Sequence, residues 1–166
     1  SEIITYSFVS PTVFDNIRLP KDTPLRNAIR ILNPLGEDTS IMRTVILPSM
    51  LDILARNHAY KNKGVKLYEM GRIYLPVEGR DLPDEPKRLI FGTYGEHEDF
   101  FSMKGEIDAL LAALNIPAAT YVRSSDDPSY HPGRCAELRI GGQKVGVLGQ
   151  IHPLVAETYG IGADVY

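Results

Sequence analysis

The sequence predicts a protein of the α+β class, in which an antiparallel sheet is flanked by helices. Segments with the alternation of strands follow one another in the second half of the chain, and Gly141-Gly142 joins two of them as a hairpin turn. Two helical patterns stand apart from these strands instead of alternating regularly with them, as the helices of βαβ units would. Both observations favour strands connected by hairpins.

The first third of the chain predicts short elements. Alternating β-branched and aromatic residues predict a strand from Ile3 to Val9. Ser10-Pro11 then provides a cap and a first-turn proline for a short helix. A loop at residues 19–23 follows, and residues 28–32 predict a second strand that Asn33-Pro34 ends.

A long apolar helix is predicted from Ile46 onward. Its apolar residues recur at helical spacing, and Ile46 and Ile53 widen the stripe beyond what one packing surface needs, so we expect the helix to be covered on two sides. Pro48 lies in the first turn, where a missing N–H costs little. Basic residues and Gly64 predict the C-terminus.

The second half is dominated by strands. Residues 65–75 predict the strongest strand, interrupted at Gly71, and residues 88–94 its antiparallel neighbour after an exposed, proline-rich connector. An amphipathic helix is predicted over residues 103–114. The remaining predicted elements are strands at 120–123, 135–140 and 144–151 and a short helix from Pro153 to Gly160.

Length and composition predict one domain over residues 1–166. The 166 residues have a mass of 18.5 kDa and are 43% hydrophobic, which is enough for one core. The chain opens on a strand without an initiator Met, which indicates a piece of a longer protein. No run approaches the roughly 18 apolar residues of a membrane span, and the single Cys135 cannot form an internal disulfide. We therefore expect a soluble, cytoplasmic protein.

The charge of the chain argues against a dedicated nucleic-acid binder, because the formal net charge is -3. A local basic group could contact RNA phosphates, although a solvated helix end is the favoured interpretation in so acidic a chain. Its members are Arg56, His58, Lys61, Lys63 and Lys66.

Motifs for phosphate binding and metal binding are weak. There is neither a Walker loop nor a G-x-G-x-x-G fingerprint. His131, Cys135 and His152 superficially suggest zinc, but a second ligand pair is missing and both histidines precede proline, so structural His-Pro corners are favoured. Near His97, Glu98 and Asp99 precede a predicted helix, where capping is favoured over acid-base catalysis.

Two arginines are flanked by apolar residues that should draw them inward. A buried arginine needs carboxylate or carbonyl partners, and Glu37, Asp38 and Glu69 are candidates for Arg43 and Arg72. A structural or interface ion pair is favoured over substrate recognition, although both look alike in sequence.

The order of motifs along the chain is its most specific feature. These motifs are Asn33-Pro34-Leu35-Gly36-Glu37-Asp38, Ile41-Met42-Arg43-Thr44, residues 67–74, residues 100–105, His131-Pro132-Gly133-Arg134 and residues 146–153. Over nearly its whole length the chain resembles the beta subunits of bacterial phenylalanyl-tRNA synthetase, in their catalytic-like module.

The resemblance implies a fold similar to a class II aminoacyl-tRNA synthetase catalytic domain, excised from a longer beta chain. It implies an alpha2beta2 assembly with the catalytic alpha subunit and the remaining beta-chain domains as partners, and contact with tRNA through the complete enzyme. ATP and magnesium are implied for that enzyme, and no cofactor, metal or catalytic residue for this chain itself.

A class II active site needs an arginine at the end of its second-motif strand, because negative charge concentrates at the α-phosphate in the transition state. Here Leu75 follows Gly71-Arg72-Ile73-Tyr74. The resemblance therefore implies a degenerate synthetase domain kept as an assembly surface. Candidate structural or interface residues are Arg43, Ile46, Met50, Ile53, Glu69 and Arg72.

Two alternatives remain open. The domain could still bind ATP or an adenylate, as a ligase-like or ligand-sensing module, although Leu75 argues against it. It could instead bind tRNA through the basic residues 56–66, although the net acidity argues against that role.

Overall fold

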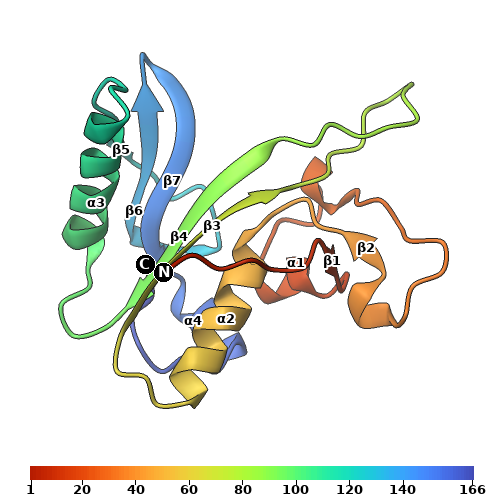
Figure 1. Cartoon of the computed structure of the whole chain (residues 1–166), viewed down its shortest axis with the longest axis horizontal. Helices are drawn as coiled ribbons and strands as arrows, with labels where there is room; N and C mark the ends of the chain where they lie inside the picture. Colours follow the sequence, from red (N-terminus) through yellow and green to blue (C-terminus); the bar gives the residue numbers. More distant parts are fainter.

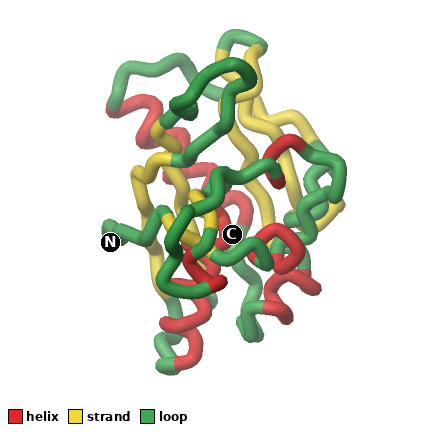
Figure 2. The backbone as a smooth tube through the Cα atoms, turned by 90° about the vertical axis from the view of Figure 1, so that its right-hand side faces the viewer, coloured by secondary structure: helices red, strands yellow, loops and turns green.

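A computed structural model describes all residues, 1–166, and its helices and strands bear out the α+β class (Figure 1). In chain order the elements are β1 (Phe8–Val9), α1 (Val13–Asn16), the 3₁₀ turns η1 (Pro24–Arg26) and η2 (Glu37–Thr39), β2 (Ile41–Met42), α2 (Leu47–Ala59), β3 (Val65–Arg72), β4 (Lys87–Tyr94), α3 (Phe100–Ala113), β5 (Thr120–Arg123), β6 (Tyr130–Ile140), β7 (Gln143–Ile151) and α4 (Pro153–Thr158). Long loops separate many of them (Figure 2). None of the helices has the length and apolarity needed to cross a membrane.

The strands form three small antiparallel sheets: β1-β2, the β3-β4 hairpin and β5-β6-β7. The last residues of the chain join two of these sheets. Tyr166 exchanges backbone hydrogen bonds of 2.8 and 2.9 Å with Thr93 of β4, and the carbonyl of Val165 accepts a 2.8 Å bond from Ile151 of β7. The hairpin and the three-stranded sheet are therefore connected through main-chain hydrogen bonds.

The main core lies between α2, the β3-β4 hairpin and α4. Met50, Leu51 and Leu54 of α2 are buried there together with Tyr94 of β4 and Val155 of α4. The contacts of α2 with both the hairpin and α1 confirm that this helix is covered on more than one side.

A second, smaller cluster lies under α3. Met103 packs against Leu138 of β6 and Leu148 of β7, so α3 covers one face of the three-stranded sheet (Figure 1). Asp99 caps the helix by accepting a 2.7 Å hydrogen bond from the Ser102 amide, and the Ser102 hydroxyl accepts one from the Asp99 amide in return. This confirms the capping role expected before the helix.

The strands in the first third are shorter than predicted. Of the expected strand from Ile3 to Val9, only β1 and an isolated parallel bridge between Glu2 and Tyr68 are formed. Residues 28–32 form no strand, only a bridge between Arg30 and Ile41. The reason is that their neighbour, β2, is two residues long and cannot support a longer ladder.

Three local expectations also change. The first helix begins after Thr12 rather than Ser10. The left-handed residue that follows α2 is Lys61, with φ 63°, and not Gly64. Gly71 does not interrupt β3: a Cβ there would lie 2.3 Å from Nη2 of Arg43, so the glycine makes room for that side chain inside a continuous strand. By contrast, Gly141-Gly142, with φ 58° and 83°, forms the predicted hairpin turn.

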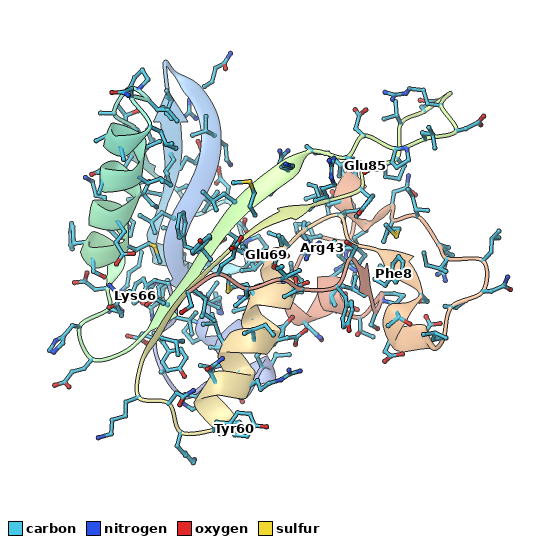
Figure 3. All side chains as sticks on the ribbon, viewed as in Figure 1. Phe8, Arg43, Tyr60, Lys66, Glu69 and Glu85 are labelled. Atoms are coloured by element: carbon cyan, nitrogen blue, oxygen red, sulfur yellow. The ribbon has the colours of Figure 1, made fainter.

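Arg43 and Glu69 form a buried ion pair at the centre of the first half, with each side chain 3% exposed (Figure 3). Nη2 of Arg43 lies 3.0 Å from Oε1 of Glu69, Nη1 donates to Oγ1 of Thr5 at 2.7 Å, and Nε donates to the carbonyl of Arg72 at 2.9 Å. Thr5 in turn donates its hydroxyl to Glu69 at 2.7 Å. The N-terminal segment, β3 and the segment that joins β2 to α2 are thus held together at one point.

Replacing Arg43 with methionine should destabilise the domain by about 3–5 kcal/mol, because it leaves Glu69 buried without its cation. Arg72→Met is the matched control, since the Arg72 side chain is half exposed, and should change stability by about 1 kcal/mol or less. Urea unfolding measures both. Equal losses for the two variants would contradict the role assigned to the buried pair.

Gly92→Ala should also destabilise the domain, by about 1–3 kcal/mol, because of overpacking. A Cβ at Gly92 would lie 2.7 Å from Cγ of Met50 and 2.9 Å from Cδ1 of Leu54. Gly146→Ala in β7 is the control, because a Cβ there meets nothing within 4 Å, and its unfolding free energy should change by about 0.5 kcal/mol or less. A neutral Gly92→Ala would mean that α2 can move away from the hairpin.

Candidate functional site

The predicted ion pair is real, but it is closed to a ligand. Arg43 and Glu69 come together, and each nitrogen of the Arg43 guanidinium group already donates to a protein oxygen. Glu37 and Asp38 lie in the exposed turn η2 and take no part. Both side chains are only 3% exposed, so a phosphate or carboxylate of a substrate cannot reach the guanidinium, and this group is structural.

Arg72 was expected in the interior and is not there. It lies on the solvent side of β3, where its guanidinium donates to the carbonyl of Glu85 at 3.1 Å and its Nη1 is 3.8 Å from the Glu85 carboxylate. The alternation of β3 explains the position: Glu69 and Gly71 face inward, so Met70 and Arg72 face outward. Apolar neighbours in sequence did not indicate the side of the strand.

The three apolar candidates on the long helix have different environments. Ile46 and Met50 are buried, whereas Ile53 is partly exposed. Met50 packs inside the main core, so its side chain is not available to a partner in the folded domain. The wide stripe on this helix mainly serves internal packing.

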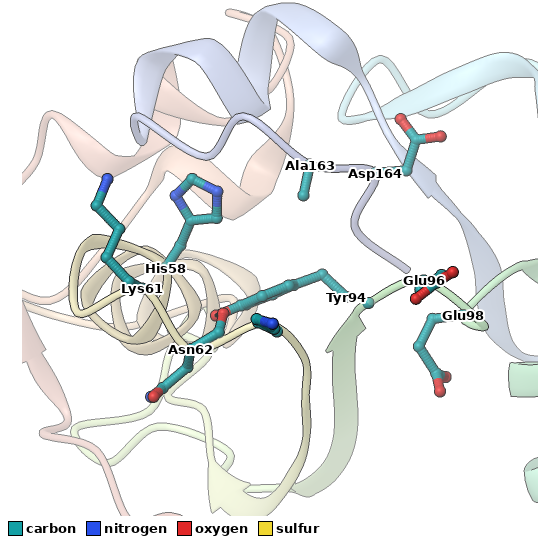
Figure 4. Close-up of a pocket in the computed structure, with 10 residues that line it drawn as sticks. His58, Lys61, Asn62, Tyr94, Glu96, Glu98, Ala163 and Asp164 are labelled. Atoms are coloured by element: carbon teal, nitrogen blue, oxygen red, sulfur yellow. Dashed lines mark hydrogen bonds between the residues drawn. The ribbon is translucent and has the colours of Figure 1, made fainter.

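The surface contains an open depression of about 520 Å³ (Figure 4). It lies where the C-terminus of α2, the end of β4 and residues 163–164 meet. Tyr94 forms one wall: its hydroxyl donates to the carbonyl of Asn62 at 3.0 Å and its ring meets His58 edge-on at 5.7 Å. Burial raises the pKa of Tyr94, which keeps the phenol neutral.

The charges around this depression are mixed. Lys61 and Lys63 line it together with Glu96, Glu98 and Asp164, so the basic group expected from sequence has acidic counterparts. Glu98 also lies 3.0 Å from the ammonium group of Lys66. The sequence did not indicate this balance, because the acidic residues follow β4 and α4 and only the fold brings them to α2.

The chemistry of the depression is therefore limited. It holds no nucleophile paired with a base and no set of oxyanion donors. No group of three or more His, Cys, Asp or Glu side chains in the chain is arranged so that it could hold a metal ion. The arrangement can support weak polar binding, but the side chains needed for catalysis are not assembled.

The two His-Pro segments are structural corners. Nδ1 of His131 accepts the amide of Gly133 at 3.0 Å, and Nδ1 of His152 accepts the amide of Leu154 at 3.1 Å, so each imidazole spans the following proline. Burial, with Arg18 and His131 nearby, lowers the pKa of His152 and favours the neutral form that can accept this bond. Burial also raises the pKa of the Cys135 thiol to about 11, which makes it a poor metal ligand.

The feature that sequence analysis missed is an apolar surface on the solvent side of the hairpin and the N-terminal segment. Ile4, Tyr6, Tyr68, Met70 and Leu89 are all exposed there. The signal was present: the first nine residues place apolar side chains on both faces of the segment, which is typical of a strand covered on both sides.

Comparisons with known proteins agree on one family. Residues 1–166 match the family described as the phenylalanyl tRNA synthetase beta chain CLM domain. The phenylalanine–tRNA ligase beta subunits of Clostridium tetani and Clostridium acetobutylicum are 44% and 42% identical to the chain, each over 100% of it. The one from Geobacter metallireducens is 37% identical, also over 100% of the chain. The chain spans about a fifth of these relatives, 21%, 21% and 22% of their lengths.

The same fold occurs in a synthetase outside this family. Pyrrolysyl-tRNA synthetase from Desulfitobacterium hafniense superposes with a TM-score of 0.76 at 16% identity, over 99% of this chain and 57% of that one. This likeness supports the class II-like fold that the resemblance implied. With the family match over its full length, the chain belongs to the family of phenylalanyl-tRNA synthetase beta-chain CLM domains.

Proposed function

We propose that this domain is a non-catalytic assembly module within a phenylalanine–tRNA ligase beta subunit, and that it supports the alpha subunit that attaches phenylalanine to its tRNA. The complete enzyme would be a cytoplasmic alpha2beta2 assembly, with ATP, magnesium and tRNA bound by its other parts. The family and the names of its relatives support this role.

The observation that carries the proposal is Leu75. It occupies the position after Gly71-Arg72-Ile73-Tyr74, where the catalytic domains of this fold need a cation for the α-phosphate of ATP. In the structure Leu75 exchanges two backbone hydrogen bonds of 2.9 Å with Asp84. An aliphatic side chain at this point supplies no charge and no hydrogen-bond donor to a phosphate.

Neither Arg43 nor Arg72 replaces the missing cation. The buried guanidinium of Arg43 donates hydrogen bonds to Glu69, Thr5 and the Arg72 carbonyl. Arg72 faces outward and is half exposed. The domain keeps the class II-like fold, but its buried Arg43 stabilises the domain itself. Such a domain is suited to holding other parts of an enzyme in place.

The alternative is a residual site for ATP or an adenylate, and the depression beside Tyr94 is the observation that favours it. Its volume of about 520 Å³ is within the range of ligand pockets. Glu96, Glu98 and Asp164 on its wall disfavour a triphosphate, however, because like charges repel.

Equilibrium dialysis of the complete alpha–beta enzyme with Mg-ATP tests the proposal. We expect about one ATP per alpha–beta pair, because only the alpha subunit would supply a phosphate-binding arginine. About two ATP per pair would overturn the proposal. Lys61→Glu with Lys63→Glu in the beta chain locates a second site: loss of only one ATP class would assign it to the depression beside Tyr94.

A further inference from the structure

Three segments of the chain meet at Ser129, which is 1% exposed. Its hydroxyl donates to the carbonyl of Ile17 at 2.6 Å, and its carbonyl accepts the amide of His152 at 2.8 Å. Arg18 follows Ile17 directly in the chain. The end of α1, the start of β6 and the junction of β7 with α4 are therefore held side by side, and Arg18 and His152 come close together.

His131 lies on the same side of β6 as Ser129. Tyr130, between them, pairs with β7 and packs against the main core, so the residues on either side of it point away from that core. In this register His131 and His152 are diagonal neighbours on one face, a spacing at which long side chains can interact. In agreement, burial and the nearby charges of Arg18 and His131 lower the pKa of His152.

Both imidazoles are held in the same tautomer. Nδ1 of His131 accepts the amide of Gly133, and Nδ1 of His152 accepts the amide of Leu154. In a neutral ring the proton is then on Nε2, which becomes a hydrogen-bond donor. Neither Nε2 atom donates to a group of the protein. The two rings thus present two free N–H donors.

Arg18 has no carboxylate partner, although one is close in sequence. Asp15 is already paired with Lys21 at 2.6 Å and with Arg26 at 2.8 Å. The carboxylate of Asp127, which precedes β6, accepts a backbone amide at 2.9 Å. No carboxylate lies within 4 Å of the exposed Arg18 side chain or of either imidazole. The positive charge of this cluster is therefore uncompensated.

We propose that Arg18, His131 and His152 form a binding site for a phosphate dianion. The three side chains offer a guanidinium group and two Nε2–H donors, and a phosphate offers the acceptor oxygens that such donors need. The site is independent of the assembly role proposed above.

An RNA backbone is less suited to this cluster. Arg18 is its one permanent cation, and the nearby Lys21 and Arg26 are paired with Asp15, whereas nucleic-acid binding depends on neutralising several phosphates together. The imidazoles add positive charge only when they are protonated, and a bound dianion favours that form. Binding of the anion should therefore strengthen as the pH falls.

Equilibrium dialysis of labelled sulfate against the full-length chain that contains this domain tests the site. Sulfate keeps its double charge between about pH 6 and 8, so a change in its affinity over that range reports the imidazoles. We expect binding about five-fold tighter at the lower pH, because the added protons attract the anion. Arg18→Met should weaken binding about ten-fold or more, because a charge-assisted hydrogen bond is lost.

Arg88→Met is the matched control for Arg18→Met. Arg88 is an exposed arginine of β4 whose side chain donates only to the carbonyl of Lys87, on the arm of the hairpin that points away from α4 (Figure 1). This variant should bind sulfate like the unmodified chain. Equal sulfate affinities of the two variants would overturn the proposal.

A second measurement reads one imidazole directly. Hydrogen exchange of the histidine ring C–H, followed by peptide mass spectrometry, reports the pKa of individual histidines. Sulfate at constant ionic strength should raise the pKa of His152 by about 0.5 or more, because an anion stabilises the imidazolium form, and the rise should be smaller in Arg18→Met. His97, exposed between Glu96 and Glu98, is the internal control, and its ring exchange should not respond. A His152 ring that ignores sulfate would reject the site.

His152→Asn separates binding from folding. The Oδ1 atom of asparagine can still accept the Leu154 amide, so α4 keeps its cap while the Nε2 donor is lost. The variant should remain folded and lose most of the pH dependence of sulfate binding, and an unchanged pH dependence would contradict the assignment. A response of His152 to tRNA but not to sulfate or phosphate would assign the cluster to RNA instead. Each of these results leaves the ATP count, and with it the proposed function, intact.

Discussion

The first half of this domain depends on the burial of one guanidinium group. Arg43 joins its own segment to Thr5 of the N-terminal segment and to two points of β3, the Glu69 carboxylate and the Arg72 carbonyl. It can do so only because Gly71 has no side chain in its path. The network also orders the N-terminal segment beside β3, although that segment forms few ladder hydrogen bonds of its own. Specific polar contacts here replace the regular pairing that the alternating sequence suggested.

Elements with strong local signals could be predicted, and those defined by distant partners could not. The pair β3 and β4, the β6-β7 turn and the capped helix α3 follow from alternation, glycines and a capping residue. The strand expected at residues 28–32 failed because its only neighbour is two residues long. Arg72 faced outward because the pleat, and not its apolar neighbours, decides the side of a strand.

The candidate site, too, could be predicted only where local chemistry defines it and not where distant segments do. The pairing of Arg43 with Glu69 followed from the cost of burying an arginine alone, and the two His-Pro corners from the chemistry of proline. The acidic residues that balance Lys61 and Lys63 come from other elements and could not be placed beside them. The buried charges of Arg43 and Glu69 are engaged with each other.

The position of residues 165 and 166 between β4 and β7 has a consequence for biosynthesis. The backbone groups of Thr93 find their partner only in Tyr166, which is synthesised long after β4. While the ribosome makes the intervening residues, β4 has an open edge of the kind that pairs with other chains. Contacts between residues so far apart in sequence are also slow to form. Until Val165 and Tyr166 have emerged, this edge of β4 stays unprotected.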